Sequence, residues 1–125
     1  MSRILLIDDD KDLLAVLKTL LQKKGFDIYA RDSWEEDSGI INYFKPNLVI
    51  LDVFLAGLDG LEICKKIKRS PFWKNIPVLM VSGFPRVAET AVYEYGADDF
   101  IAKPFEVSDL LRKIHKIFLR RHESV

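Results

Sequence analysis

Ile4–Asp10, with the sequence ILLIDDD, decides the fold because four apolar residues run directly into three acids. The same design returns three times, with a polar residue closing a short apolar run: Asp52 after residues 48–51, Ser82 after 78–81 and Lys103 after 100–102. Continuous apolar runs of this length are typical of parallel strands buried on both faces. Since open α/β sheets bind ligands at the carboxyl ends of their strands, we expect these polar side chains to share one crevice.

Helical periodicity alternates with these runs along the chain. We expect strands at residues 3–7, 26–30, 47–51, 76–81 and 100–102. We expect helices from residue 12 to the basic pair before Gly25, over residues 33–43, from the cap Asp59 to Ser70, near residues 87–95 and over residues 107–119. Five strand and helix units with short connections predict an α/β fold, a flavodoxin-like doubly wound five-stranded parallel sheet of order 2-1-3-4-5 with five helices. In that order the first and third strands are neighbours.

Length and composition limit the classes of protein that fit. A chain of 125 residues is the size of one domain, so residues 1–125 are expected to form a single unit. Lys and Arg total 19 and Asp and Glu total 19, without the basic excess typical of a protein that binds nucleic acid or an anionic membrane. The single cysteine, Cys64, excludes an internal disulfide and suits a reducing compartment. No apolar stretch is long enough to span a bilayer, and the cytoplasm is the expected location.

The acids have a simpler explanation that must be weighed first. An aspartate ahead of a helix often only caps its free amides, and an aspartate after a strand often only starts a loop. The joint placement of Asp8, Asp9 and Asp52 at the ends of two neighbouring strands favours a shared site instead. With Lys103 the formal charge of such a site is −3 + 1 = −2, which a divalent cation would neutralise. Carboxylate oxygens suit Mg²⁺, whereas no thiol or imidazole falls at this edge to favour zinc.

A cation beside an aspartate points to chemistry at phosphorus. Asp52 is the candidate nucleophile, because a carboxylate next to Mg²⁺ can attack a phosphoryl group and form an aspartyl phosphate. Ser82 and Lys103 would then meet the phosphoryl oxygens and stabilise their charge.

These residues resemble the response-regulator receiver domains (CheY-like) of two-component phosphorelays. The resemblance rests on five stretches in the family's order and spacing, which span nearly the whole chain: residues 4–10 (ILLIDDD), 48–52 (LVILD), 58–62 (LDGLE), 77–83 (PVLMVSG) and 96–105 (GADDFIAKPF). It implies a phosphoprotein that takes a phosphoryl group from a histidine kinase or phosphotransfer protein, with Mg²⁺ as cofactor, and controls a downstream protein or output domain. It also implies a signalling domain rather than a separate enzyme, although the domain catalyses its own phosphotransfer and dephosphorylation.

The resemblance assigns roles within the crevice. Asp52 resembles the phosphoacceptor, and Asp8 and Asp9 resemble the acidic pair that places Mg²⁺. The backbone carbonyl of Phe54 resembles a further metal ligand. Lys103 resembles the lysine that meets the phosphoryl group, and its junction with the following proline is often cis in the family.

The resemblance also implies a switch that reaches a distant face. Ser82 resembles the hydroxyl that moves to the phosphoryl group, and Phe100 resembles the aromatic switch residue, whose simpler role is that of a core side chain. The movement would reshape the face of the fourth helix, fifth strand and fifth helix, where we expect Arg86, Glu89, Tyr93, Asp98, Asp99, Arg112, Lys113 and Lys116. Mixed charges on a helix are usually only a solvated surface, and a phosphorylation-promoted homodimer through this face is the alternative.

Phe54 and Phe84 each stand two residues after a site residue. They occupy the loop positions that resemble those tuning the lifetime of the phosphoryl group. Bulky apolar side chains there would hinder an attacking water; the alternatives are contacts with a partner or simple exposure on a loop. The chain departs from the family at Ala56, four residues after the phosphoacceptor, where proline is usual. Gly57 follows, and we expect a looser loop there.

Three other classes of protein compete with this reading. A phosphatase with an aspartate nucleophile needs a second acid two residues later as general acid or base, and that position is Phe54. A degenerate receiver that binds partners without phosphorylation would not need the intact set of acids, hydroxyl and lysine. A nucleotide-binding protein would carry a glycine-rich phosphate loop after a strand, and none occurs.

Overall fold

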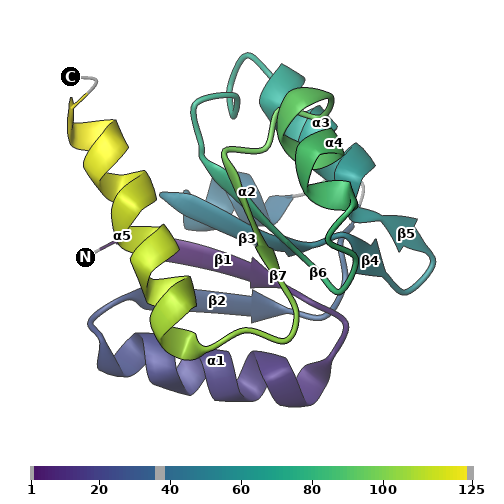
Figure 1. Cartoon of the computed structure of the whole chain (residues 1–125). Coiled ribbons are helices and arrows are strands. Elements are labelled where there is room, and N and C mark those ends of the chain that lie inside the picture. Colours follow the sequence, from purple (N-terminus) through teal and green to yellow (C-terminus); the bar gives the residue numbers. More distant parts are fainter. Residues whose placement is uncertain (1, 36–38, 124–125) are drawn as a thin grey trace.

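A computed structural model describes residues 2–35 and 39–123. Within them, five parallel strands form one sheet in the order β2-β1-β3-β6-β7 (Figure 1). The strands are β1 (Arg3–Ile7), β2 (Asp27–Arg31), β3 (Leu48–Asp52), β6 (Val78–Ser82) and β7 (Asp99–Ala102). This order confirms the predicted order 2-1-3-4-5, and β1 and β3 are neighbours as expected.

Five helices cover the two faces of this sheet in the described part of the chain (Figure 1). They are α1 (Lys11–Lys23), α2 (Gly39–Phe44), α3 (Gly60–Arg69), α4 (Val87–Tyr93) and α5 (Val107–Glu123). α1 and α5 pack on one face, and α2, α3 and α4 pack on the other. None of the helices described is both long enough and apolar enough to cross a bilayer.

Alternation along each strand divides the core into two layers. In β1, Ile4 and Leu6 belong to the layer that packs on α1 and α5, while Leu5 and Ile7 belong to the layer that packs on α3 and α4. All four side chains are almost completely buried. Burying each such side chain contributes roughly 1.5–3 kcal/mol of hydrophobic free energy. Because both faces of the sheet are covered, the strand needs apolar residues at every position, which is the pattern that the sequence shows.

The second helix is shorter than predicted. Residues 33–35 are not helical and α2 begins at Gly39, while residues 36–38 of the predicted helix 33–43 lie outside the described residues. Trp34 is 8% exposed and packs into the core layer under α3 and α4. Arg31 and Glu35 form an ion pair of 3.2 Å on either side of it. The predicted start of this helix is therefore wrong, because residues 33–35 belong to a connection in which Trp34 packs into the core.

The remaining boundaries differ from the prediction by a few residues. β2, β3 and β6 span residues 27–31, 48–52 and 78–82, and β7 begins one residue earlier than expected. α4 ends at Tyr93 rather than at residue 95, and α5 continues to Glu123 rather than ending at residue 119. Periodicity specifies the interior of an element better than its ends, which depend on local hydrogen bonds.

A short hairpin that no sequence pattern predicted follows β3. β4 (Phe54–Leu55) pairs antiparallel with β5 (Leu58–Asp59), and Ala56 and Gly57 form the turn between them. Gly57 has a φ of +76°, a left-handed conformation that glycine adopts with little strain. The stretch at Ala56 and Gly57, expected to be a looser loop, is therefore a defined turn.

The start of α3 lies directly against the end of β3. Asp59 caps α3, as predicted, by accepting the backbone N–H of Leu61 at 2.9 Å. The backbone N–H of Gly60 donates to the carbonyl of Val53 at 2.7 Å. A Cβ atom on Gly60 would overlap the carbonyl oxygen of Asp52 and lie 2.9 Å from the Cα of Val53. Only glycine therefore fits at this position without a shift of the backbone.

Gly60→Ala is expected to lower the free energy of unfolding by about 2 kcal/mol or more, because the added methyl group must push the end of β3 away. For a domain of this size the melting temperature should fall by roughly 5–10 °C, as followed by circular dichroism. Gly39→Ala is the matched control, since a Cβ atom on Gly39 meets nothing within 4 Å. Equal melting temperatures for the two variants would contradict this close packing of α3 on β3.

Candidate functional site

Four polar side chains meet at the carboxyl edge of the sheet. Asp8 follows β1, Asp52 and Ser82 are the last residues of β3 and β6, and Lys103 follows β7. Asp8, Asp52 and Ser82 are 3%, 6% and 1% exposed, and within residues 2–35 and 39–120 they are the buried charged and hydroxyl side chains. Buried polar groups destabilise a fold unless they are paired, so their concentration at one point marks a candidate functional site.

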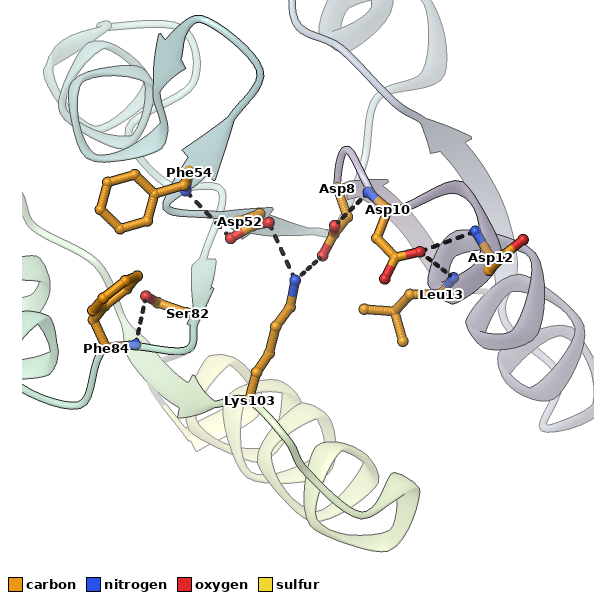
Figure 2. A network of polar contacts seen from close by, with 9 residues as sticks. All are labelled: Asp8, Asp10, Asp12, Leu13, Asp52, Phe54, Ser82, Phe84 and Lys103. Carbon is orange, nitrogen blue, oxygen red and sulfur yellow. Dashed lines mark hydrogen bonds and ion pairs between the residues drawn. The ribbon is translucent and has the colours of Figure 1, made fainter.

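Lys103 joins the two buried carboxylates. Its Nζ atom lies 2.8 Å from Oδ2 of Asp8 and 3.2 Å from Oδ2 of Asp52 (Figure 2). Asp9 is exposed at the rim of the same group and adds a third carboxylate. The peptide bond between Lys103 and Pro104 is cis, as expected. One ammonium group thus contacts two of the three acids.

Burial and mutual repulsion change the acidity of these groups. Burial raises the pKa of Asp52 above its ordinary value of 3.8, and the charge of Asp8 raises it further; Lys103 and the N–H of Phe54 offset only part of this. Burial alone would lower the pKa of Lys103, but the hydrogen bonds and charges of Asp8 and Asp52 outweigh burial and raise it. Lys103 therefore stays protonated at neutral pH, and it compensates the charge of Asp52 incompletely.

Three carboxylates can converge on one cation. One oxygen from each of Asp8, Asp9 and Asp52 lies within 4.8 Å of the others. A donor set of oxygens alone, with a formal charge of −2 once Lys103 is counted, suits a hard divalent cation such as Mg²⁺. No imidazole or thiol joins this group among the described residues. Cys64 is buried elsewhere in the core, where desolvation raises the pKa of its thiol to about 12.

Asp10 has a different role from its neighbours. Its Oδ1 atom accepts the backbone N–H groups of Asp12 and Leu13, each at 3.1 Å, and so caps α1. The backbone N–H of Asp10 donates in turn to Oδ1 of Asp8 at 2.9 Å (Figure 2). The simpler capping explanation therefore holds for Asp10, whereas the Asp8 side chain points into the site.

Two loops hold site side chains through backbone amides. The N–H of Phe54 donates to Oδ1 of Asp52 at 3.3 Å, and the N–H of Phe84 donates to Oγ of Ser82 at 3.0 Å (Figure 2). The rings of these two phenylalanines meet edge to face with centroids 5.2 Å apart, although they are 54% and 60% exposed. An aromatic contact thus bridges β4 and the β6–α4 connection beside Asp52.

Phe100 is a core residue that also lines a groove. It is 9% exposed, packs in the core layer under α3 and α4, and is the register partner of Met80 in β6. It therefore fills the simpler role of a core aromatic in this structure. It also lines a groove of about 720 Å³ between α4, β7 and α5, together with Pro85, Ala88, Ala102, Phe105 and Lys113.

The expected face of α4, β7 and α5 needs one correction. The Oδ2 atom of Asp98 accepts Nζ of Lys68 at 2.9 Å and the backbone N–H of Val78 at 2.8 Å. Asp98 therefore ties α3 to the start of β6 instead of standing free on that face. Asp99 does contribute to it, because its Oδ1 accepts Nζ of Lys113 of α5 at 3.1 Å.

Gly60 is the residue beside the site whose importance no motif indicated. It lies within the quoted stretch 58–62, but its contact with the backbone of Asp52 joins positions that only the fold brings together. A glycine at the first position of a helix, directly after the cap Asp59, is the sequence signal that another backbone passes close by.

Asp52→Asn should stabilise the metal-free protein at neutral pH. Because the pKa of Asp52 is raised on folding, its contribution to stability is complete below its ordinary pKa of 3.8 and is lost as pH rises through the folded pKa. The neutral amide removes that penalty, so the melting temperature in EDTA at pH 7 should rise by about 3 °C, on the order of 1 kcal/mol.

The gain should shrink as the pH falls toward 4, which a series of thermal melts measures. Asp27→Asn is the control, since Asp27 is an exposed acid at the start of β2. A less stable Asp52→Asn variant at pH 7 would mean that attraction to Lys103 outweighs the burial of Asp52.

Comparison with known proteins agrees with this arrangement. A family model described as the response regulator receiver domain matches residues 4–115. A solved protein from Chloroflexus aurantiacus, described as a putative response regulator, is 33% identical, with a TM-score of 0.84 over 93% of this chain and 96% of that one. A CheY-like receiver domain protein from Methanospirillum hungatei is 26% identical, with a TM-score of 0.89 over 100% of this chain and 99% of that one.

A longer protein contains a similar domain. NtrX from Brucella abortus is 32% identical, with a TM-score of 0.82 over 99% of this chain but only 29% of that one. The family match spans most of this chain and includes all strand residues of the sheet except Arg3. The protein therefore belongs to the response regulator receiver domain family, whose members act in two-component signal transduction.

Proposed function

We propose that this receiver accepts a phosphoryl group on Asp52 and so carries a signal in a phosphorelay. The observation that carries the proposal is the buried pair of carboxylates, Asp8 and Asp52, bridged by Nζ of Lys103 at 2.8 Å and 3.2 Å. Membership of the receiver family supports it. The excess of negative charge at this edge of the sheet is explained if the site binds a cation together with a phosphoryl group.

The proposed reaction is the transfer of a phosphoryl group from a phosphohistidine. A carboxylate oxygen of Asp52 attacks phosphorus, the oxygen–phosphorus bond forms, and the phosphorus–nitrogen bond breaks. The imidazole leaves with the electron pair and takes up a proton. Lys103 meets a phosphoryl oxygen, and Ser82 meets another after its hydroxyl turns inward, so both stabilise the developing charge. Hydrolysis of the acyl phosphate by water later returns Asp52 to its carboxylate.

The proposed cofactor is Mg²⁺. Asp8, Asp9, Asp52 and the backbone carbonyl of Phe54 would hold it, a set that the convergence of the three carboxylates within 4.8 Å supports. Once bound, the ion would neutralise charge on the phosphoryl oxygens. Asp8 would then exchange part of its contact with Lys103 for the cation, which leaves the ammonium available to the phosphoryl group.

The proposed switch runs from Ser82 to the face of α4, β7 and α5. In the structure Oγ of Ser82 accepts the N–H of Phe84, so turning toward a phosphoryl group costs that hydrogen bond and frees the β6–α4 connection. Phe100 lies on the neighbouring strand β7, where it pairs with Met80 of β6, and it lines the groove on that face. Binding at the groove and phosphorylation would then favour the same arrangement.

Partners follow from this chemistry. A histidine kinase or a phosphotransfer protein would supply the phosphoryl group, and a downstream protein or an output domain would read the face of α4, β7 and α5. A homodimer promoted by phosphorylation through the same face is the alternative use, and the cytoplasm is the proposed location. The phosphatase alternative is weaker, because Phe54 occupies the position of the second acid and is an exposed aromatic.

Treatment with Mg²⁺ and a small-molecule phosphodonor should add one phosphoryl group to the protein, as seen by mass spectrometry of the intact chain. The adduct should survive mild acid and be lost in base, as expected of an acyl phosphate. Asp52→Asn should reduce its formation at least tenfold, whereas Asp59→Asn, which changes only the cap of α3, should not. No adduct on the unaltered protein, or an equal adduct on Asp52→Asn, would contradict the proposal.

Replacing Phe54 and Phe84 by serine should shorten the lifetime of the phosphoryl group. The rings contact each other beside Asp52, and removing them opens a path for water, so we expect a roughly threefold to tenfold faster loss of phosphate. Because the two rings form one contact, the single variants should each show most of the effect.

The decay of the phosphorylated form over time measures this directly. Phe72→Ser is the matched control, since Phe72 is an exposed phenylalanine in a different connection. An unchanged decay in the double variant would leave the two rings as partner contacts or as exposed loop aromatics.

A further inference from the structure

A second surface combines exposed aromatic and basic side chains where α2 and α3 end. We call it the basic aromatic corner, and its members are Tyr43, Lys45, Arg69, Phe72 and Lys74. Phe72 is 88% exposed and Tyr43 is 81% exposed, and all three cations are exposed. Scattered exposed apolar residues need no explanation, but an almost fully exposed phenylalanine among cations does.

The turn that presents Phe72 is held by hydrogen bonds. Oγ of Ser70 accepts the backbone N–H groups of Phe72 and Trp73 at 3.2 Å and 3.3 Å. The Nε1 atom of Trp73 donates to Oδ1 of Asn42 in α2 at 3.0 Å, which joins the turn to the end of α2 beside Tyr43. Trp73 is therefore the internal anchor, and the adjacent Phe72 is directed outward by a fixed turn.

The charge of the corner is positive although the whole chain is neutral. No Asp or Glu occurs in residues 39–51 or 63–88. Of the cations on α3, Lys68 is paired with Asp98 at 2.9 Å, and Lys65 lies over the ring of Tyr95. Basic residues often end a helix because they complement its dipole, and that explains Arg69. It does not explain Lys74 or Phe72, which lie beyond the end of α3 at Arg69.

The basic aromatic corner lies at the opposite end of the sheet from the acids of the candidate site. Lys45 stands just before β3 and Lys74 just before β6, whereas Asp52 and Ser82 are the last residues of the same two strands. A surface that binds the corner would therefore leave the carboxyl edge open. The inference is independent of the proposed phosphotransfer.

We propose that the basic aromatic corner docks on an anionic lipid surface. Two exposed aromatic side chains flanked by lysine and arginine match interfacial anchors, in which the rings enter the headgroup region and the cations meet lipid phosphates. Protein interfaces deplete lysine, and two of the three cations are lysines, so a lipid surface fits better than an acidic protein. The neutral net charge predicted no membrane partner, but the local distribution of charge decides this contact.

Vesicle sedimentation of the full chain tests the proposal. Vesicles that contain about one third phosphatidylglycerol and two thirds phosphatidylcholine should bind the protein at low salt. Vesicles of phosphatidylcholine alone should not bind it. Binding should fall at least fivefold for Phe72→Ser and for Lys74→Glu, and high salt should abolish it because surface charges are screened. Both side chains are exposed, so thermal melts should match those of the unaltered protein.

Two control variants separate this corner from general stickiness. Tyr93→Ser removes an aromatic that is 83% exposed on α4, and Lys24→Glu reverses an exposed charge at the end of α1; neither should change binding by more than about 1.5-fold, because surface contacts act locally. No binding to the anionic vesicles, equal binding to neutral ones, or equal losses in the controls would overturn the proposal. An acidic protein surface would then be the occupant to seek.

Discussion

The main physical constraint on this structure is that two buried carboxylates, Asp8 and Asp52, are held beside one ammonium group. Burying a charge is costly unless it is paired, and here Lys103 must serve both acids at 2.8 Å and 3.2 Å. Asp52 ends β3, and Asp8 and Lys103 directly follow β1 and β7, so the cluster exists only when these three strands end at the same edge. The hydrophobic layers on either face of the sheet supply the free energy that keeps these charges together. The fold therefore concentrates an excess of negative charge at one edge of the sheet.

Hydrogen bonds and close packing connect this site to the rest of the molecule. The backbone N–H of Phe54 donates to Oδ1 of Asp52, the backbone N–H of Phe84 donates to Oγ of Ser82, and the two rings touch. A group that draws Ser82 toward Asp52 must break one of these hydrogen bonds and disturb the loop before α4. On the other side of the site, α3 packs at Gly60 so closely on the backbone of Asp52 that α3 has no room to move toward it. In the proposed switch, movement would therefore be directed toward α4 rather than toward α3.

Much of this was predictable from the sequence, for physical reasons that also mark the limit. Strands covered on both faces leave continuous apolar runs, so the sheet order and the shared edge of Asp8 and Asp52 followed directly. The strands β4 and β5 have two residues each, which is too few to show the alternating pattern of a strand. The start of the helix predicted over residues 33–43 was wrong because an irregular connection can also place an apolar residue, here Trp34, in the core. The different roles of Asp8 and Asp10 depend on where each side chain points, which adjacent identical residues do not reveal.

A crystal structure of the protein with Mg²⁺ and beryllium fluoride, an analogue of the phosphoryl group, would test the central claim most directly. We predict that the analogue lies on Asp52, that the cation lies on Asp8, Asp9 and Asp52, and that Nζ of Lys103 contacts fluorine. It also predicts that Oγ of Ser82 has left the N–H of Phe84, from which it now lies at 3.0 Å. A cation bound elsewhere, or Lys103 still bridging Asp8 and Asp52 with the analogue in place, would contradict it.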